Sequence, residues 1–79
     1  MNQPTIKVRD LGLAAALVSC GYEIKETYQE TSGRSYFIFI ETDGLNRAVT
    51  DYWADVLVVR ARKLSDNIKM LKSLIYSKQ

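Results

Sequence analysis

The first twenty residues show two kinds of hydrophobic pattern in succession. Residues 5–9 alternate between apolar and charged side chains, which predicts a strand with one buried face. Residues 11–20 are rich in alanine and leucine and follow Asp10, a residue type that often caps helix N-termini. They end at Gly21, which can adopt the left-handed conformation that closes a helix. This part of the chain therefore predicts a strand followed by a helix that packs closely on it.

A second alternating stretch and a continuous apolar run follow. Residues 22–29 predict a strand with one solvated face, and residues 30–34 predict a hairpin loop. The run Tyr36–Ile40 consists of five consecutive large apolar side chains and predicts a third strand. Because side chains alternate along a strand, Phe37 and Phe39 would lie on one face of the sheet and the other three side chains on the opposite face.

The C-terminal half predicts two more helices. Thr42 or Asp43 could cap the first of them, in which apolar residues recur at helical spacing. The clearest helical pattern of the chain runs from residue 60 or 61 to about residue 76. The β-branched segment 56–59 between them favours an extended conformation, with a short fourth strand or a continuous helix as the alternatives.

The order of these elements predicts the topology of the sheet. Two strands joined by a helix run parallel when they lie in one sheet, whereas a hairpin makes the third strand antiparallel to the second. Placing the apolar third strand in the centre gives it the greatest burial. We therefore predict one α+β domain over residues 1–79 with β-α-β-β-α-α order. Its three-stranded antiparallel sheet would have the order 1-3-2, with helices on at least one face.

Composition and cysteine content place this domain among globular proteins of the cytoplasm. The chain has 79 residues, of which 47% are hydrophobic and 25% charged, as in ordinary globular domains. Its single cysteine, Cys20, excludes an internal disulfide framework and is predicted to be a buried structural thiol. The N-terminal residues lack the pattern of a signal peptide, and no apolar run is long enough to span a membrane.

Few side chains suit catalysis or metal binding. The chain has no histidine, the commonest acid–base catalyst and metal ligand. Asp51 and Asp55 are one helical turn apart and could hold a hard cation, although solvated surface charge explains them more simply. No glycine-rich phosphate loop, zinc spacing or nucleophile motif is present. We predict no enzymatic activity, no cofactor, no metal site and no small-molecule substrate.

The apolar third strand is the first candidate for binding. A chain this short has little material to cover both faces of such a strand. An uncovered face would form an interaction surface that includes Tyr36, Phe37 and Phe39. Base stacking on exposed aromatic side chains is an alternative, and coverage of both faces by the chain itself is another.

The basic C-terminal helix is the second candidate. Residues 60–79 carry six Lys or Arg residues against one Asp, net +5, whereas residues 1–59 carry five basic and eight acidic residues, net −3. A basic helical face can bind nucleic-acid phosphates, and an ordinary solvated face is the alternative. The residues predicted to make such contacts are Arg60, Arg62, Lys63, Lys69 and Lys72.

Several segments resemble one known family in their order and spacing. The segments are Asp10–Leu17, Gly21–Tyr22, Tyr36–Phe39, Tyr52–Trp53, Leu57–Val59 and Leu71–Tyr76. Together they resemble a family of short bacterial and phage proteins described as domain of unknown function 5659. Members often have Asn-Gly after the Tyr-Trp pair, where this chain has Ala54-Asp55. The resemblance implies one intact domain in a bacterial or mobile-element context, and it implies no catalytic residue.

These observations lead to two functional hypotheses. The first is a non-enzymatic cytoplasmic interaction module that self-associates as a homodimer, or binds another protein, through an apolar sheet or helix face. The alternative is a small nucleic-acid-binding protein that uses its basic C-terminal helix.

Overall fold

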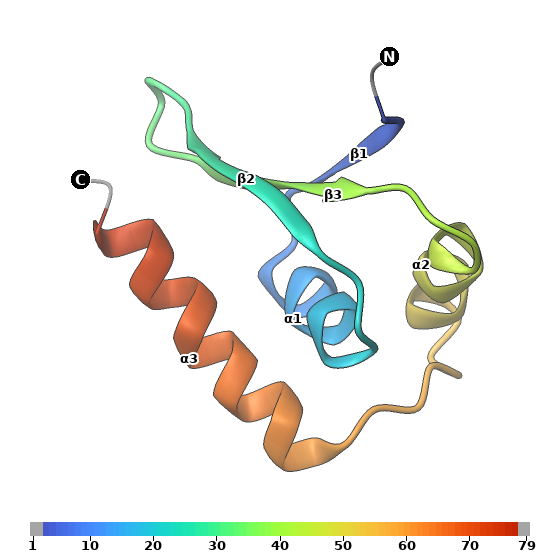
Figure 1. The fold of residues 1–79 in the computed structure, drawn as a ribbon. Coiled ribbons are helices and arrows are strands. Elements are labelled where there is room, and N and C mark those ends of the chain that lie inside the picture. The colour runs from blue at the N-terminus through green and yellow to red at the C-terminus, as the bar shows by residue number, and fades with distance from the viewer. Residues whose placement is uncertain (1–2, 78–79) are drawn as a thin grey trace.

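The computed structural model describes residues 3–77 and has the predicted α+β class and β-α-β-β-α-α order (Figure 1). Within residues 3–77, none of the helices has the length and apolar character of a membrane-spanning segment. The elements are β1 (Thr5–Val8), α1 (Leu11–Ser19), β2 (Ile24–Gln29), β3 (Ser35–Ile40), α2 (Leu45–Trp53) and α3 (Ala61–Ser77).

The three strands form one sheet in the order β1-β3-β2, and β3 is antiparallel to both neighbours. The predicted topology is therefore confirmed. On the β1 side, Ile6 lies opposite Phe39 and Val8 opposite Phe37. On the β2 side the register shifts between Ile24 and Glu26, so that one extra residue of β2 interrupts the regular pairing with β3.

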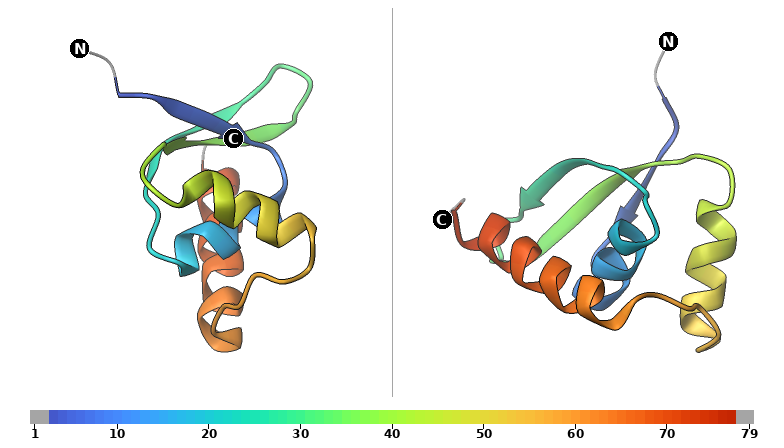
Figure 2. Two further views of the ribbon diagram at one scale, coloured as in Figure 1. Left: turned by 90° about the vertical axis from the view of Figure 1, so that its right-hand side faces the viewer. Right: turned by 60° about the horizontal axis from the view of Figure 1, so that its bottom comes forward.

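All three helices lie on one side of this sheet (Figures 1 and 2). Helix α1 contacts both other helices, and its small side chains at Ala14 and Ala15 are completely buried. The absence of bulk there lets the helices approach one another closely. The sheet supplies Phe37 and Phe39 to the core, while α2 supplies Leu45 and α3 supplies Leu71.

The N-terminal caps of α1 and α2 differ in their chemistry. Asp10 caps α1 as predicted, because its carboxylate accepts a hydrogen bond of 2.8 Å from the backbone N–H of Leu13. The prediction of Thr42 or Asp43 as the cap of α2 was wrong, since Gly44 occupies that position without a side-chain hydrogen bond. Gly44 has a φ of 87°, a left-handed conformation that glycine adopts without a steric penalty.

The segment 56–59 belongs to neither a helix nor the sheet, so the predicted alternative of a short fourth strand was wrong. A turn at Ala54 and Asp55 follows α2 and directs the chain along the helices, away from the sheet (Figure 1). Val56 and Val58 are exposed, whereas the two residues that alternate with them are half-buried. The β-branched pattern therefore reflects one-sided packing against the helical layer.

Candidate interaction surface

The side of the sheet opposite the helices is left uncovered by residues 3–77 (Figures 1 and 2). We call this side the open face. Because opposed residues of antiparallel strands share a face, the pairing with β3 identifies its members. They are Thr5 and Lys7 of β1, Tyr36, Ile38 and Ile40 of β3, and Glu26 and Tyr28 of β2. The open face thus has an apolar centre between more polar edges.

Two of the three predicted interaction residues are absent from this surface. Phe37 and Phe39 are 1% and 0% exposed and belong to the core, so neither can contact a partner in this fold. Tyr36 is half-buried and lies on the open face. The predicted alternation along β3 is correct, but the interaction surface was assigned to the wrong face for the two phenylalanines. The physical reason is that Phe37 and Phe39 share their face with Ile6 and Val8, which the helices cover.

The middle of the open face is a row of three residues across the sheet. Ile38 on the central strand lies opposite Lys7 on one side and opposite Glu26 on the other. An apolar side chain is therefore flanked by a positive charge on the β1 side and a negative charge on the β2 side. Neither Lys7 nor Glu26 takes part in an ion pair among residues 3–77.

One end of the open face is aromatic. The rings of Tyr28 and Tyr36 are stacked, with their centroids 5.3 Å apart and an angle of 25° between their planes. Lys7 Nζ lies 4.5 Å from the centroid of the Tyr36 ring, and the guanidinium carbon of Arg9 lies 5.4 Å from it. Both distances suit cation–π attraction, which holds the ring of Tyr36 in place between the strands.

Tyr28 is also held through its hydroxyl group. The hydroxyl donates a hydrogen bond of 2.5 Å to a carboxylate oxygen of Glu26. This hydrogen bond is the main reason that the pKa of Tyr28 is raised above its ordinary value. The Glu26 carboxylate is therefore hydrogen-bonded to a neighbouring side chain of the open face.

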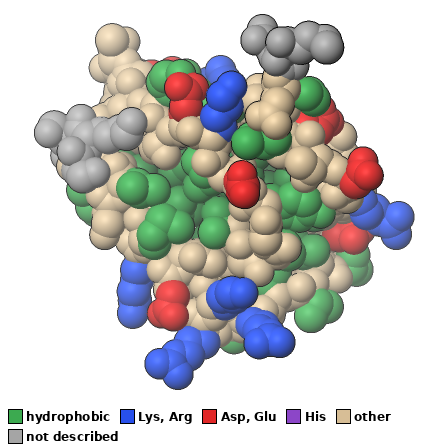
Figure 3. Space-filling view, in the orientation of Figure 1, with side chains coloured by type: hydrophobic (Ala, Val, Ile, Leu, Met, Phe, Trp, Pro, Cys, Tyr) green, Lys and Arg blue, Asp and Glu red, His purple; other side chains and the backbone are tan. Residues whose placement is uncertain are grey.

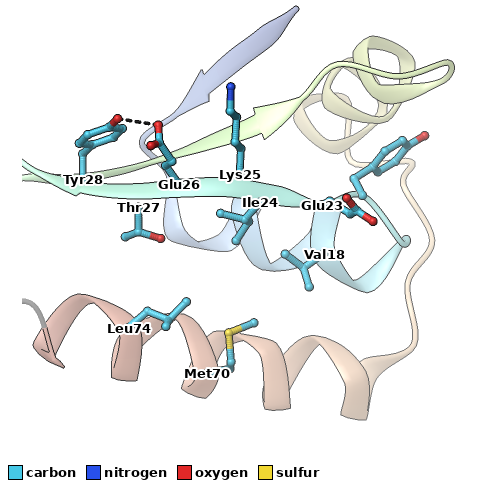
Figure 4. A pocket seen from close by; sticks show the side chains of 10 residues that line it. Val18, Glu23, Ile24, Lys25, Glu26, Thr27, Tyr28, Met70 and Leu74 are labelled. Atoms are coloured by element: carbon cyan, nitrogen blue, oxygen red, sulfur yellow. Dashed lines mark hydrogen bonds between the residues drawn. The ribbon is translucent and has the colours of Figure 1, made fainter. Parts of the chain in front are cut away.

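A groove of about 680 Å³ lies on the other side of β2, between this strand and α3 (Figure 4). Ile24 and Thr27 point from β2 toward α3, whereas Lys25, Glu26 and Tyr28 point away from it. Met70 and Leu74 line the opposite wall. Lys25, Glu26 and Tyr28 also contribute to the lining of the groove, so the groove and the open face adjoin each other along β2.

The predicted nucleic-acid contacts of α3 and its N-terminal flank are all exposed; they are Arg60, Arg62, Lys63, Lys69 and Lys72. Basic side chains gather at the lower edge of the molecule, where α3 begins, away from the sheet (Figure 3). The ion pairs among residues 3–77 are Arg9–Glu30 and Arg47–Asp51, so these five residues neutralise no carboxylate in this part of the chain.

The thiol and the carboxylates considered in the sequence occupy the surface. Cys20 is exposed, and its prediction as a buried thiol was wrong, because α1 ends at Ser19 and the next residue lies at its cap. The partial burial of this thiol still raises its pKa. Asp51 pairs with Arg47 at 3.2 Å. No three cysteine or carboxylate side chains of the described segment come together to hold a metal ion.

Sequence reasoning did not identify Lys7, Glu26 and Ile38 as parts of one surface. The alternation of β1 contained the signal for Lys7, which occupies a polar position of that strand. Glu26 is instead in phase with Ile24 and Tyr28, so strict alternation would place it on the same face as Ile24. Placing them beside Ile38 also requires the register with β3, and on the β2 side that register depends on the extra residue. The sequence alone therefore lacked the pairing of β1 and β2 with β3, which brings these three side chains onto one face.

Comparison with known proteins identifies a protein family. A family model described as Domain of unknown function (DUF5659) matches residues 3–77. No curated protein and no solved structure matches the chain.

Proposed function

We propose that this chain, which belongs to the DUF5659 family, is a non-enzymatic cytoplasmic module that associates with a second copy of itself through the open face. The observation that carries the proposal is the row Lys7–Ile38–Glu26 at the centre of a sheet face that none of the helices within residues 3–77 covers. A cytoplasmic location is supported by the free thiol of Cys20, which is typical of reducing compartments.

The open face of a second copy can pack against the open face of the first, because both are sides of a sheet. Two sheets pack face to face about 10 Å apart, and their inner side chains then form a shared apolar layer. Tyr36, Ile38 and Ile40 are half-buried in the single chain and would lose their remaining exposure in such a layer. Each square ångström of apolar surface removed from water contributes about 25 cal/mol. The resulting pair would have its helices on the outside and two sheets in the middle.

The size of the open face limits the strength of this association. Three strands about 4.8 Å apart, with about six residues rising 3.4 Å each, give a face of roughly 14 by 20 Å. Stable complexes usually bury about 800 Å² on each partner, which is more than this face offers. We therefore expect a dimer that dissociates on dilution.

Ile38→Asp is expected to weaken the dimer at least tenfold, because it places a charge at the centre of the apolar contact. Light scattering over a concentration series would measure the dissociation constant, and circular dichroism would verify the fold. Val58→Asp is the matched control, since Val58 is 89% exposed and lies outside the open face. A wild-type chain that stays monomeric at the highest concentration, or an Ile38→Asp chain that dimerises like wild type, would contradict the proposal.

The exposed basic side chains of α3 and its N-terminal flank support a second candidate function, nucleic-acid binding. They neutralise no carboxylate among residues 3–77, so their charge is available to phosphate groups. Each phosphate contact releases counterions and makes the affinity dependent on salt.

Combining Lys69→Glu with Lys72→Glu is expected to weaken binding to a labelled random-sequence oligonucleotide about tenfold or more at low salt. It should also reduce the slope of log Kd against log salt concentration by about 1.4–1.8, since two phosphate contacts are lost. Fluorescence anisotropy would measure both quantities. The combination of Arg34→Glu and Arg47→Glu changes the net charge equally, involves exposed residues outside α3 and serves as the control. Wild-type protein that binds no oligonucleotide at low salt would refute this function.

A further inference from the structure

The two edges of the open face differ in charge. On the β1 side, Lys7 lies beside Ile38 without an ion pair among residues 3–77, whereas the charge of Arg9, near Tyr36, is paired with Glu30. On the β2 side, Glu26 lies beside Ile38, and Tyr28 is stacked on Tyr36. The face is thus asymmetric about the central strand, and this asymmetry restricts how a second copy can dock.

Two arrangements of a symmetric pair bring Ile38 of one copy onto Ile38 of the other. If the two-fold axis runs parallel to β3, the β1 edge of each copy faces the β2 edge of the other, and Lys7 faces Glu26. If the axis runs across the strands, Lys7 faces Lys7 and Glu26 faces Glu26. Opposite charges in contact stabilise an interface, whereas like charges oppose its formation.

We infer that a second copy docks on the open face about a two-fold axis parallel to β3, so that two Lys7–Glu26 ion pairs flank the central Ile38 contact. This inference rests on the self-association proposed above and adds the orientation of the copies and the residues that determine it. A two-fold contact of this kind uses the same patch on both copies, as closed dimers do.

The aromatic end of the open face fits the same orientation. Arg9 follows Val8 at the end of β1, and Tyr28 lies opposite Tyr36 on β2, so the backbone of Arg9 in one copy would face Tyr28 of the other. The Arg9 guanidinium is paired with Glu30 at 2.6 Å in the single chain and would have to leave that partner to reach Tyr28. Tyr28 is 42% exposed, so its ring is available to a guanidinium group. Packed sheets cross at about 30°, and the long side chains of Lys7 and Arg9 can adjust to that angle.

Lys7 and Glu26, which would form the ion pairs between copies, do not pair with each other within residues 3–77 of the single chain. Lys7 and Glu26 are separated by β3, a distance of about two strand spacings or ~10 Å between backbones. Glu26 accepts a hydrogen bond from Tyr28, which leaves further acceptor sites on its carboxylate. Lys25 lies on the same side of β2 as Glu26 and weakens the negative potential there, so each pair contributes modestly (Figure 4).

A charge-reversal series tests the orientation. Lys7→Glu alone and Glu26→Lys alone are each expected to weaken the dimer about tenfold, because each change converts two attractive contacts into two repulsive ones. The combination of both reversals should restore the dissociation constant to within about threefold of wild type. Sedimentation velocity would measure all four proteins, and thermal unfolding at low concentration would confirm that each chain is folded.

The outcomes separate the orientation from the proposed function. Weak single variants and a restored double variant support the inference. A wild-type dimer that the single reversals leave unchanged, or that the double reversal fails to restore, would overturn the orientation and leave self-association standing. A wild-type chain that remains monomeric at every concentration would overturn the proposed function together with the inference.

Discussion

Phe39→Ala is expected to lower the free energy of unfolding by about 3–5 kcal/mol. Phe39 is completely buried on the central strand, opposite Ile6 on one side and Ile24 on the other. Truncating its ring would leave a cavity that the surrounding strands and helices can fill only in part. At 0.05–0.15 kcal/mol per residue, a chain of 79 residues has a total stability of roughly 4–12 kcal/mol. The variant would thus lose at least roughly a quarter of the stability of the chain, and all of it if the total lies at the low end of this range, as urea titration followed by circular dichroism would show.

Ile38→Ala is the matched control for this experiment. Ile38 is the neighbouring residue on the same strand, but it is half-buried and belongs to the open face. We expect Ile38→Ala to lower the free energy of unfolding by about 1 kcal/mol in a dilute, monomeric sample. Equal urea midpoints for the two variants would mean that the sheet does not bury Phe39 in preference to Ile38, and the assignment of the two faces would fail.

Leu71→Ala is expected to have the second largest effect and to lower the free energy of unfolding by about 2–5 kcal/mol. Leu71 is 0% exposed and joins α3 to the common core of α1 and the sheet. Its truncation would weaken the attachment of α3, whose other core contacts are made by half-buried residues. Urea unfolding would measure the loss, and faster cleavage within α3 by a protease would show that this helix detaches first.

Leu74 provides a control on the same helix and of the same residue type. It is 37% exposed and lines the groove between β2 and α3. Leu74→Ala should therefore lower the free energy of unfolding by about 1 kcal/mol or less. If Leu74→Ala destabilised the chain as much as Leu71→Ala, α3 would have to pack in a different rotation from the one described.

The sheet order was predictable because it follows from connections and burial. A hairpin makes consecutive strands antiparallel, and the most apolar strand favours the centre. The face that stays open was not predictable in the same way. The alternation of β3 separates Phe37 and Phe39 from Ile38, but only the register with β1 shows which set shares a face with Val8. A shift of one residue would exchange the two faces, and no hairpin turn joins β1 to β3 to fix their register.

Local signals were less informative where backbone geometry overrides residue type. Thr42 and Asp43 are good capping residues, yet α2 begins after Gly44 because the chain enters the helix through a left-handed conformation. The β-branched segment 56–59 resembles a strand in composition but has no strand within reach. Cys20 continues the apolar pattern of α1 and is exposed because the helix ends before it.

The irregular pairing of β2 has a consequence for the kind of assembly that the chain can form. An edge strand with regular free backbone groups can recruit further copies side by side, which leads to open-ended fibres. The extra residue in β2 disturbs that template, and the neighbouring charges of Lys25 and Glu26 oppose stacking of strand against strand. At the other edge, β1 has only four residues and follows Pro4. Both edges thus discourage polymerisation. A contact through the open face uses up the surface of both copies and therefore produces a dimer and no larger assembly.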